Sequence, residues 1–222
     1  ARVCASHFGL PLYRLDPGRI FEGIVGASES RLDALLALLE RMSPLVLWLD
    51  EIDKSLAGTE SGSSDGGTTA RVVGRLLTWL QENPHPVFVV ATANHPDRLP
   101  PEMLRRGRFD ELFFVDLPNA EARAEILDIH LRHKAAAALG QSPPLADALE
   151  AYLAQARSAE GFSGAELEAA LIEARLSAYA RGEALAATDL EDALAVTVPL
   201  SQSRSEDIAS LRAWAKSRAR RA

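Results

Sequence analysis

The chain has 222 residues, of which 47% are hydrophobic and 25% are charged, and its formal net charge is −7 at pH 7. These values are typical of a globular protein with one large or two small domains. The acidic balance argues against nonspecific nucleic-acid binding by the body of the protein. One cysteine excludes an internal disulfide framework. No apolar run reaches the length of a membrane span, and no His/Cys cluster has zinc spacing.

The first residues read as the end of a helix that closes at Gly9, followed by a strand near residues 11–16. Residues 28–42 carry leucines at helical spacing, and Ser43-Pro44 ends that pattern. The sequence therefore predicts an alternation of helix and strand from its start.

Leu45–Leu49 is an unbroken apolar run that predicts a buried strand, and Asp50 and Glu51 follow it directly. Open α/β sheets bind their ligands beyond the carboxyl ends of the strands. In nucleotide-hydrolysing sheets the first acid holds Mg²⁺ through its water shell, and the second orients or deprotonates the attacking water. This is the Walker B arrangement. The alternative is a buried strand that merely runs into two surface acids.

Residues 58–67 combine glycines with small polar side chains and predict a loop, and residues 71–81 predict a helix. Val87–Thr92 predicts a second buried strand, with the amide of Asn94 just beyond its end. A turn rich in arginine follows from Arg105 to Asp110.

With these three motifs in this order, the chain resembles the AAA+ ATPases. The resemblance implies that Asn94 is the sensor 1 residue, which contacts the γ-phosphate or holds the lytic water beside Glu51. It also implies that Arg105 and Arg108 reach the site of a neighbouring subunit, where a planar, permanently charged guanidinium suits phosphate oxygens. Arg106 is interpreted as a plain surface charge.

Each of these motifs has a simpler explanation. The simpler role for Asn94 is to turn the chain at the strand end before Pro96. The arginine cluster could pair within the chain with Asp110 and Glu111, and surface pairs of that kind contribute little to stability.

In one branch of the AAA+ family, a His at the position of His130 lies against the ribose and base of the nucleotide. In that branch a Gly-Ala pair, here Gly164 and Ala165, replaces the Arg of sensor 2 and packs on the adenine. A solvated or core-edge histidine and an ordinary helix start are the alternatives. Ser163 and Glu166 form the pattern of a capping box at this start.

The resemblance places pore loop 1 in residues 21–32, with Ile24 and Val25 where relatives that thread polypeptide carry an aromatic residue followed by a hydrophobic one. Both side chains could instead pack beneath the next helix. The glycine-rich loop at residues 58–67 corresponds to pore loop 2, and a plain linker explains its composition equally well.

The G-x-x-x-x-G-K-[ST] phosphate loop does not occur in this sequence. We expect it in upstream residues, together with a central strand that lies between the strand at residues 87–92 and one at residues 112–115. The sequence has no H-E-x-x-H motif, which excludes the protease relatives of this ATPase branch for this segment.

The alternation of elements predicts an α/β fold with a parallel sheet between helices, followed by a small α-helical lid. The predicted parts are a large subdomain at residues 1–118, a lid at 119–198 and a tail at 199–222. The lid helices are expected at residues 119–139, 145–158, 163–181 and 188–197, with caps at Asn119 and, as a second capping box, at Thr188 with Glu191. Residues 201–222 hold six basic and two acidic side chains and predict a basic helix.

Within the family, the motifs look closest to the stand-alone, single-module ATPases of cyanobacteria, plastids and other bacteria. The resemblance implies ATP and Mg²⁺ as cofactors, a homo-oligomeric ring of six subunits, a protein client to remodel, and a place in the cytoplasm or plastid stroma. The rival readings are a nucleotide-dependent regulatory or scaffolding subunit with little hydrolysis, and a nucleic-acid motor or loader, for which the basic tail is the sole support.

Overall fold

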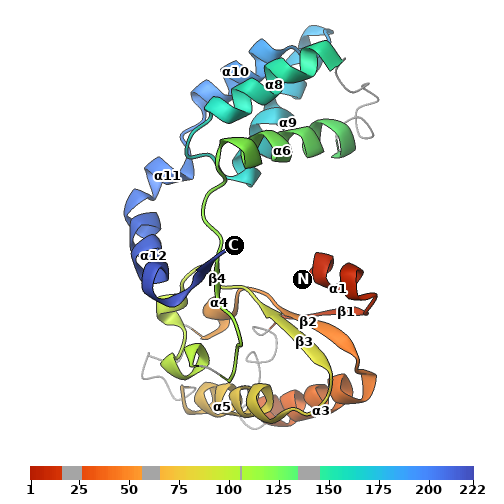
Figure 1. Ribbon diagram of the computed structural model, residues 1–222, viewed down its shortest axis with the longest axis vertical. Helices are drawn as coiled ribbons and strands as arrows, with labels where there is room; N and C mark the ends of the chain where they lie inside the picture. Colours follow the sequence, from red (N-terminus) through yellow and green to blue (C-terminus); the bar gives the residue numbers. More distant parts are fainter. Residues whose placement is uncertain (17–26, 57–65, 106, 135–145) are drawn as a thin grey trace. The chain divides into compact units, whose positions relative to one another are not determined.

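The computed structural model describes residues 1–16, 27–56, 66–105, 107–134 and 146–222 (Figure 1). The chain divides into two compact units, Ala1–Glu111 and Leu112–Ala222. No helix in these described stretches is long and apolar enough to cross a membrane.

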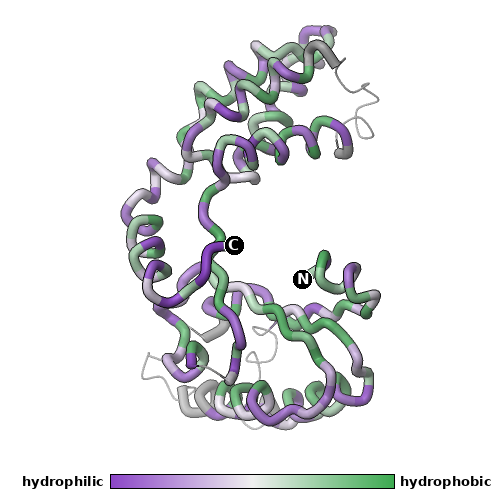
Figure 2. The backbone as a smooth tube through the Cα atoms, in the orientation of Figure 1, coloured by the Kyte–Doolittle hydropathy of each residue, from purple (hydrophilic) through white to green (hydrophobic). Residues whose placement is uncertain are grey.

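The first unit contains a parallel three-stranded sheet in the order β1-β2-β3. The strands are β1 (Leu12–Leu15), β2 (Leu45–Leu49) and β3 (Val87–Ala91). The central strand β2 is paired on both sides, and its residues other than Trp48 are buried, as its continuous apolar sequence predicts (Figure 2). The predicted α/β class with a parallel sheet is confirmed.

Helices cover both faces of this sheet (Figure 1). Helices α3 (Ala27–Met42) and α5 (Gly66–Glu82) pack on one face, where alternate residues of β2 join their apolar stripes in one core. The other face carries α1 (Arg2–Phe8), which ends at the left-handed Gly9. Short helices follow the strands: α4 (Ile52–Leu56), η2 (Pro96–Arg98) and η3 (Pro101–Leu104).

Helix α5 begins at Gly66, so the last two residues of the predicted loop 58–67 are helical. Glycine and threonine are poor helix formers, which is why the sequence placed the start of this helix later. Packing of its apolar stripe against α3 stabilises the helix as a whole.

The second unit is built on helices α6 (Ala120–Ile129), α8 (Ala146–Ser158), α9 (Gly164–Arg181) and α10 (Ala187–Val196). Helix α6 continues as a π-helical turn, η4 (His130–Lys134). The Asn119 cap is confirmed by its hydrogen bond from Ala122 N, 2.9 Å. The Ser163–Glu166 capping box is confirmed as well.

The second predicted capping box, at Thr188 and Glu191, is wrong. Helix α10 starts one residue earlier, and the Asp189 carboxylate accepts the hydrogen bond of Ala186 N at 2.9 Å. Asp189 takes the role expected of Glu191, so the N-cap lies at Ala186, two residues before the predicted cap Thr188.

Arg123 of α6 is only 5% exposed, yet its charge is fully hydrogen-bonded by backbone. Its guanidinium donates to the carbonyl oxygens of Ala156 and Pro118, both at 2.9 Å, and to that of Arg157. It thereby satisfies the last carbonyls of α8 and fixes the chain where it enters α6.

The C-terminal tail belongs to the same unit. It forms α11 (Leu200–Ser203), α12 (Ser205–Arg218) and β5 (Arg220–Arg221), which pairs in parallel with β4 (Phe113–Phe114). Arg212 Nε lies 2.9 and 3.0 Å from the two oxygens of Asp116, and Leu200 N donates to Glu166 Oε1 at 2.6 Å. The tail therefore joins the segment before α6 to the start of α9.

We expect the Arg212–Asp116 pair to stabilise the tail in a pH-dependent way. Burial by itself raises the pKa of Asp116, but hydrogen bonds from Arg212 and from Leu117 N, with the charge of Arg212, outweigh it and hold the pKa below the ordinary 3.8. Because the folded pKa is the lower one, the contribution is present at neutral pH and is lost as the pH falls below about 4.

A double-mutant cycle of Asp116→Asn and Arg212→Gln, measured by urea unfolding, should give a coupling energy of up to about 1 kcal/mol at pH 7, since both side chains are partly exposed. The coupling should be smaller at pH 3 than at pH 7. A coupling that is equal at both pH values would contradict the ion pair.

Candidate functional site

Thr92, directly after β3, joins the two predicted acids at the end of β2. Its hydroxyl accepts from Glu51 N at 3.0 Å and donates to Asp50 Oδ1 at 2.7 Å. Its backbone extends the sheet, with Thr92 N bound to Leu49 O and Ile52 N bound to Thr92 O. One residue thus sets the positions of both carboxylates.

Glu51 adopts φ +51°, the left-handed conformation that side-chain-bearing residues rarely take. Such backbone strain costs about 1–3 kcal/mol and concentrates at functional sites. The turn points the carboxylate at Asn94, whose Nδ2 lies 3.3 Å from Glu51 Oε1. Asp50, Glu51 and Asn94 are therefore brought together, as the sequence predicts.

Lys54 Nζ lies 2.8 Å from the same Glu51 carboxylate, and its side chain is 64% exposed. This hydrogen bond, with the nearby acids, raises the pKa of Lys54 against a smaller opposing effect of burial. Lys54 was not predicted from the sequence as part of the site, although its position three residues after Glu51, at the start of a helix, brings the two side chains within reach.

Asp53, in the first turn of α4, is a residue of the site that sequence reasoning missed. It is 1% exposed, and its two oxygens accept from Asn94 N at 3.3 Å and His95 N at 3.0 Å. A buried charge held only by backbone amides fixes the loop that carries Asn94 against the turn that carries Glu51.

Arg14 of β1 approaches Asp50 from the neighbouring strand. Its Nη2 lies 2.6 Å from Asp50 Oδ2, and its guanidinium lies over the ring of Trp48, with Cζ 4.9 Å from the ring centroid. The two oxygens of Asp50 are thus each engaged once, by Thr92 and by Arg14. A carboxylate has about four acceptor positions, so Asp50 keeps capacity for water or a cation.

The donor set fits Mg²⁺ in the manner of phosphoryl-transfer sites. In the described stretches no group of three or more His, Cys, Asp or Glu side chains could hold a metal by itself. Mg²⁺ in such sites keeps several waters and takes only one or two carboxylates beside the phosphates of its substrate. Asp50 would serve as that carboxylate, and a bound Mg²⁺ would neutralise charge on the phosphates.

Arg105 and Arg108 flank the left-handed Gly107 in the first unit. Arg105 is exposed, and Arg108 is half-buried with its Nε shielded from solvent and without a hydrogen-bond partner. Among the residues that the structure describes, neither Arg105 nor Arg108 forms an ion pair with Asp110 or Glu111. Arg106 lies outside the described residues.

His130, Gly164 and Ala165 lie in the second unit, on the packed helices α6 and α9. His130 Nδ1 is 3.5 Å from Glu168 Oε1, and its side chain is 13% exposed. Gly164 and Ala165 are the first two residues of α9. A Cβ on Gly164 would meet Ile126 at 3.5 Å, an ordinary contact, so packing within the unit does not require glycine there.

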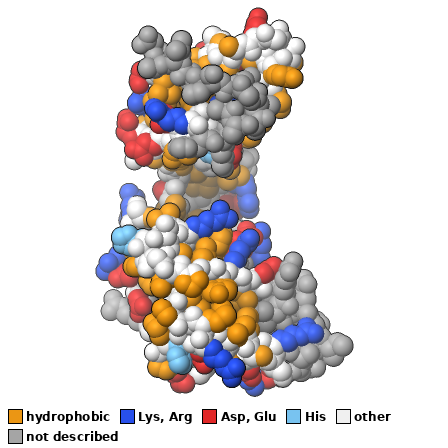
Figure 3. All heavy atoms as spheres, turned by 90° about the vertical axis from the view of Figure 1, so that its right-hand side faces the viewer, with side chains coloured by type: hydrophobic (Ala, Val, Ile, Leu, Met, Phe, Trp, Pro, Cys, Tyr) orange, Lys and Arg blue, Asp and Glu red, His pale blue; other side chains and the backbone are white. Residues whose placement is uncertain are grey.

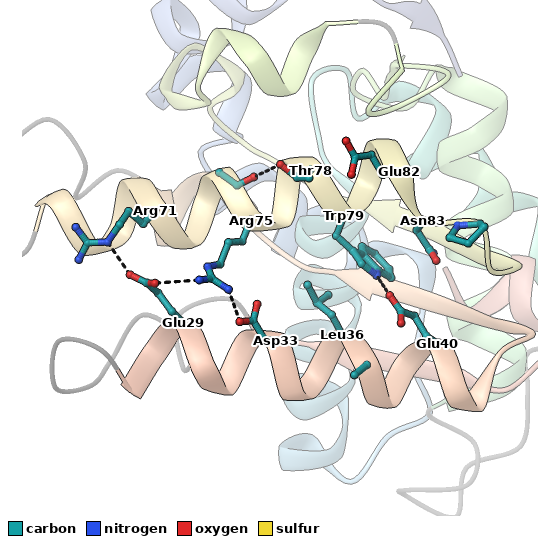
Figure 4. Close-up of a pocket in the computed structure, with 13 residues that line it drawn as sticks. Glu29, Asp33, Leu36, Glu40, Arg71, Arg75, Thr78, Trp79, Glu82 and Asn83 are labelled. Carbon is teal, nitrogen blue, oxygen red and sulfur yellow. Dashed lines mark hydrogen bonds and ion pairs between the residues drawn. The ribbon is translucent and has the colours of Figure 1, made fainter.

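Ile24 and Val25, the predicted pore-loop residues, lie outside the described residues. A groove of about 720 Å³ lies elsewhere in the first unit, between α3 and α5 (Figure 4). Ion pairs of Glu29 with Arg71 and Arg75 span it, as does the hydrogen bond from Trp79 Nε1 to Glu40. Because these contacts join α3 to α5, we interpret the groove as the seam between two packed helices.

Residues 1–117 match the family described as ATPase family associated with various cellular activities (AAA). The chain belongs to the AAA family. The AAA domain of FIGL-1, known from a crystal structure, superposes on this AAA chain with a TM-score of 0.71, at 20% identity, over 93% of this chain and 68% of that one. That likeness concerns the fold.

Curated relatives include the "Uncharacterized AAA domain-containing protein ycf46" of Pyropia yezoensis, 45% identical over 97% of this AAA chain and 42% of the relative. The protein of the same name from Trieres chinensis is 42% identical over 98% and 42%. The "ATP-dependent zinc metalloprotease FtsH 2" of Salinibacter ruber is 35% identical over 87% and 27%. The AAA chain thus spans about two fifths of the length of the ycf46 relatives.

The left-handed Glu51 predicts an unusual order of stabilities. The free energy of unfolding should be about 1 kcal/mol higher for Glu51→Gly than for Glu51→Ala, because only glycine relieves the backbone strain. At Arg31, inside the right-handed helix α3, the Ala variant should instead be the more stable by a similar amount. Urea unfolding of the four variants tests this reversal, and Ala favoured at both positions would contradict it.

The role of Asp53 predicts a large loss of stability on truncation. Asp53→Ala leaves the amides of Asn94 and His95 without acceptors and should cost about 2–3 kcal/mol, while Asp53→Asn keeps one acceptor and should cost less. Asp97→Ala, at an exposed acid of η2, should change the free energy of unfolding by no more than about 0.5 kcal/mol. Equal effects of the two Ala variants would refute the bracing role.

Proposed function

We propose that this AAA chain forms the hydrolytic part of an ATP site, in which Asp50 binds Mg²⁺ through water, Glu51 activates the attacking water and Asn94 senses the γ-phosphate. The observation that carries the proposal is the contact of Asn94 Nδ2 with Glu51 Oε1, fixed by the Thr92 hydroxyl and the Asp53 carboxylate. A water between an amide donor and a carboxylate is both held and polarised, which is the positioning that phosphoryl transfer to water requires.

Arg105 and Arg108 are proposed to act on the site of a neighbouring subunit in a ring. In support, neither pairs with an acid of the described chain, and the shielded Nε of Arg108 is a donor without a partner. Buried donors are normally satisfied, so such a group calls for an acceptor from elsewhere. Phosphate oxygens fit a guanidinium well. His130, Gly164 and Ala165 are proposed to contact the nucleoside, and Ile24 and Val25 to line the pore.

The proposed work of the ring is the remodelling of a protein client. The FtsH 2 relative is named as ATP-dependent, which supports ATP as the nucleotide. Lys54 favours a second candidate, a regulatory subunit with little hydrolysis, because its ammonium group occupies the Glu51 carboxylate that would otherwise face the attacking water. Lys54 is largely exposed, however, and free to leave Glu51 when a substrate enters.

The two candidates differ in ATP turnover by the full-length protein. Glu51→Gln keeps the shape of the side chain and removes the base, so phosphate release should fall by about 10²-fold or more while ATP binding persists. Glu82→Gln, the same change at the exposed end of α5, is the matched control and should behave as wild type.

Steady-state phosphate release and retention of labelled ATP are the two measurements. Wild-type turnover with an unaffected Glu51→Gln variant would refute the role of Glu51. Negligible turnover in the wild type, with ATP bound, would favour the regulatory candidate instead.

A further inference from the structure

Arg14 reaches the proposed cation ligand from one strand away. It stands opposite Trp48 in the β1–β2 register, and Asp50 follows two residues after Trp48. Side chains two residues apart share a face of a sheet, so Arg14 faces Trp48 directly and Asp50 diagonally. Its guanidinium contacts both, at 4.9 Å from the ring centroid and 2.6 Å from Asp50 Oδ2.

These two contacts hold a long side chain that is 60% exposed in one place. An ion pair so open to solvent contributes little to stability, which leaves its effect on the site as the larger consequence. A positive charge that touches a carboxylate offsets the attraction of that carboxylate for another cation and repels the cation itself. Trp48 supports the guanidinium from the same face through a cation–π contact.

We propose that Arg14 is a resident counter-ion of Asp50, which balances this carboxylate before a divalent cation arrives and weakens the hold of the site on that cation afterwards. The inference rests on the proposed function, in which Asp50 is the cation ligand. Arg14 acts through Asp50 and is therefore a positioning residue. With Arg14 present, the site binds a divalent cation less tightly than Asp50 and the phosphates would bind it in the absence of Arg14.

The test uses Mn²⁺ as a probe for Mg²⁺, bound to the full-length protein with ADP, and counts free Mn²⁺ by electron paramagnetic resonance. Arg14→Gln should bind Mn²⁺ about five- to tenfold more tightly than wild type, because the competing charge is gone. Arg14→Lys keeps the charge and should stay within about threefold of wild type. The gain in Arg14→Gln should shrink as salt is added.

Arg71→Gln is the matched control. Arg71 Nε lies 2.6 Å from Glu29 Oε1 and its side chain is 57% exposed, values close to those of the Arg14–Asp50 pair. Its partner Glu29 lies in the seam between α3 and α5 and is not part of the proposed site. Mn²⁺ affinity should therefore be unchanged in this variant. Arg14→Met, which keeps an unbranched stem on Trp48, repeats the test if Arg14→Gln does not fold.

Asp50→Asn separates the inference from the proposed function. Loss of Mn²⁺ affinity in Asp50→Asn, with unchanged or weaker binding in Arg14→Gln, would overturn the counter-ion role and leave the site assignment standing. Wild-type Mn²⁺ affinity in Asp50→Asn would overturn the assignment of Asp50 itself. If Arg71→Gln also bound Mn²⁺ tenfold more tightly than wild type, the effect would be one of general charge, and the specific role of Arg14 would be refuted.

Discussion

The Thr92 hydroxyl is the contact on which the site depends. A hydroxyl offers one donor and two acceptor positions. The Thr92 hydroxyl accepts a hydrogen bond from Glu51 N and donates one to Asp50 Oδ1. The backbone bonds of Thr92 continue the β2–β3 ladder one step past the strand ends. The left-handed turn at Glu51 persists because both its amide and the residue before it are held from the adjacent strand.

Three acids lie within four residues, and their surroundings give each a different task. Asp53 is buried and bonded only to backbone amides, so it acts as structure. Asp50 is balanced by Arg14 and Glu51 by Lys54, and both cationic side chains are mostly exposed. A buried charge is fixed by its environment, whereas an exposed partner can be replaced when a ligand supplies stronger contacts. The proposed roles in ATP hydrolysis therefore fall to Asp50 and Glu51, whose cationic partners are exposed.

The sequence was sufficient where a signal is local. Periodicity predicted the strands β2 and β3 and the helix α3, and the caps at Asn119 and Ser163 were read from adjacent residues. The prediction that β3 is buried is wrong, because none of its residues is buried and Phe88 is exposed. On the exposed face of the first unit, apolar side chains gather (Figure 3), and Phe8 and Phe88, both half-exposed, contact edge to face. Among the residues that the structure describes, β3 pairs only with β2.

The sequence was insufficient where a contact joins distant segments. Arg14 meets Asp50 only through the β1–β2 register, and Arg123 bonds to carbonyls of α8 more than thirty residues away. The pairing of β5 with β4 joins positions about a hundred residues apart. No short-range pattern encodes such partners. The three predicted subdomains stay predictions. The arginines proposed to reach a neighbouring subunit and the residues proposed to contact the nucleoside also stay predictions, because each would contact a group outside its own unit.

The position of Trp48 gives the molecule a built-in optical reporter. An indole excited beside a guanidinium emits differently once that charge moves away, so events at the strand end are readable in the near ultraviolet without a dye. Trp79 sits in the helix seam and Trp214 in the tail helix, each with its own neighbour. Replacing those two rings by phenylalanine would leave one emitter, placed where the acids meet.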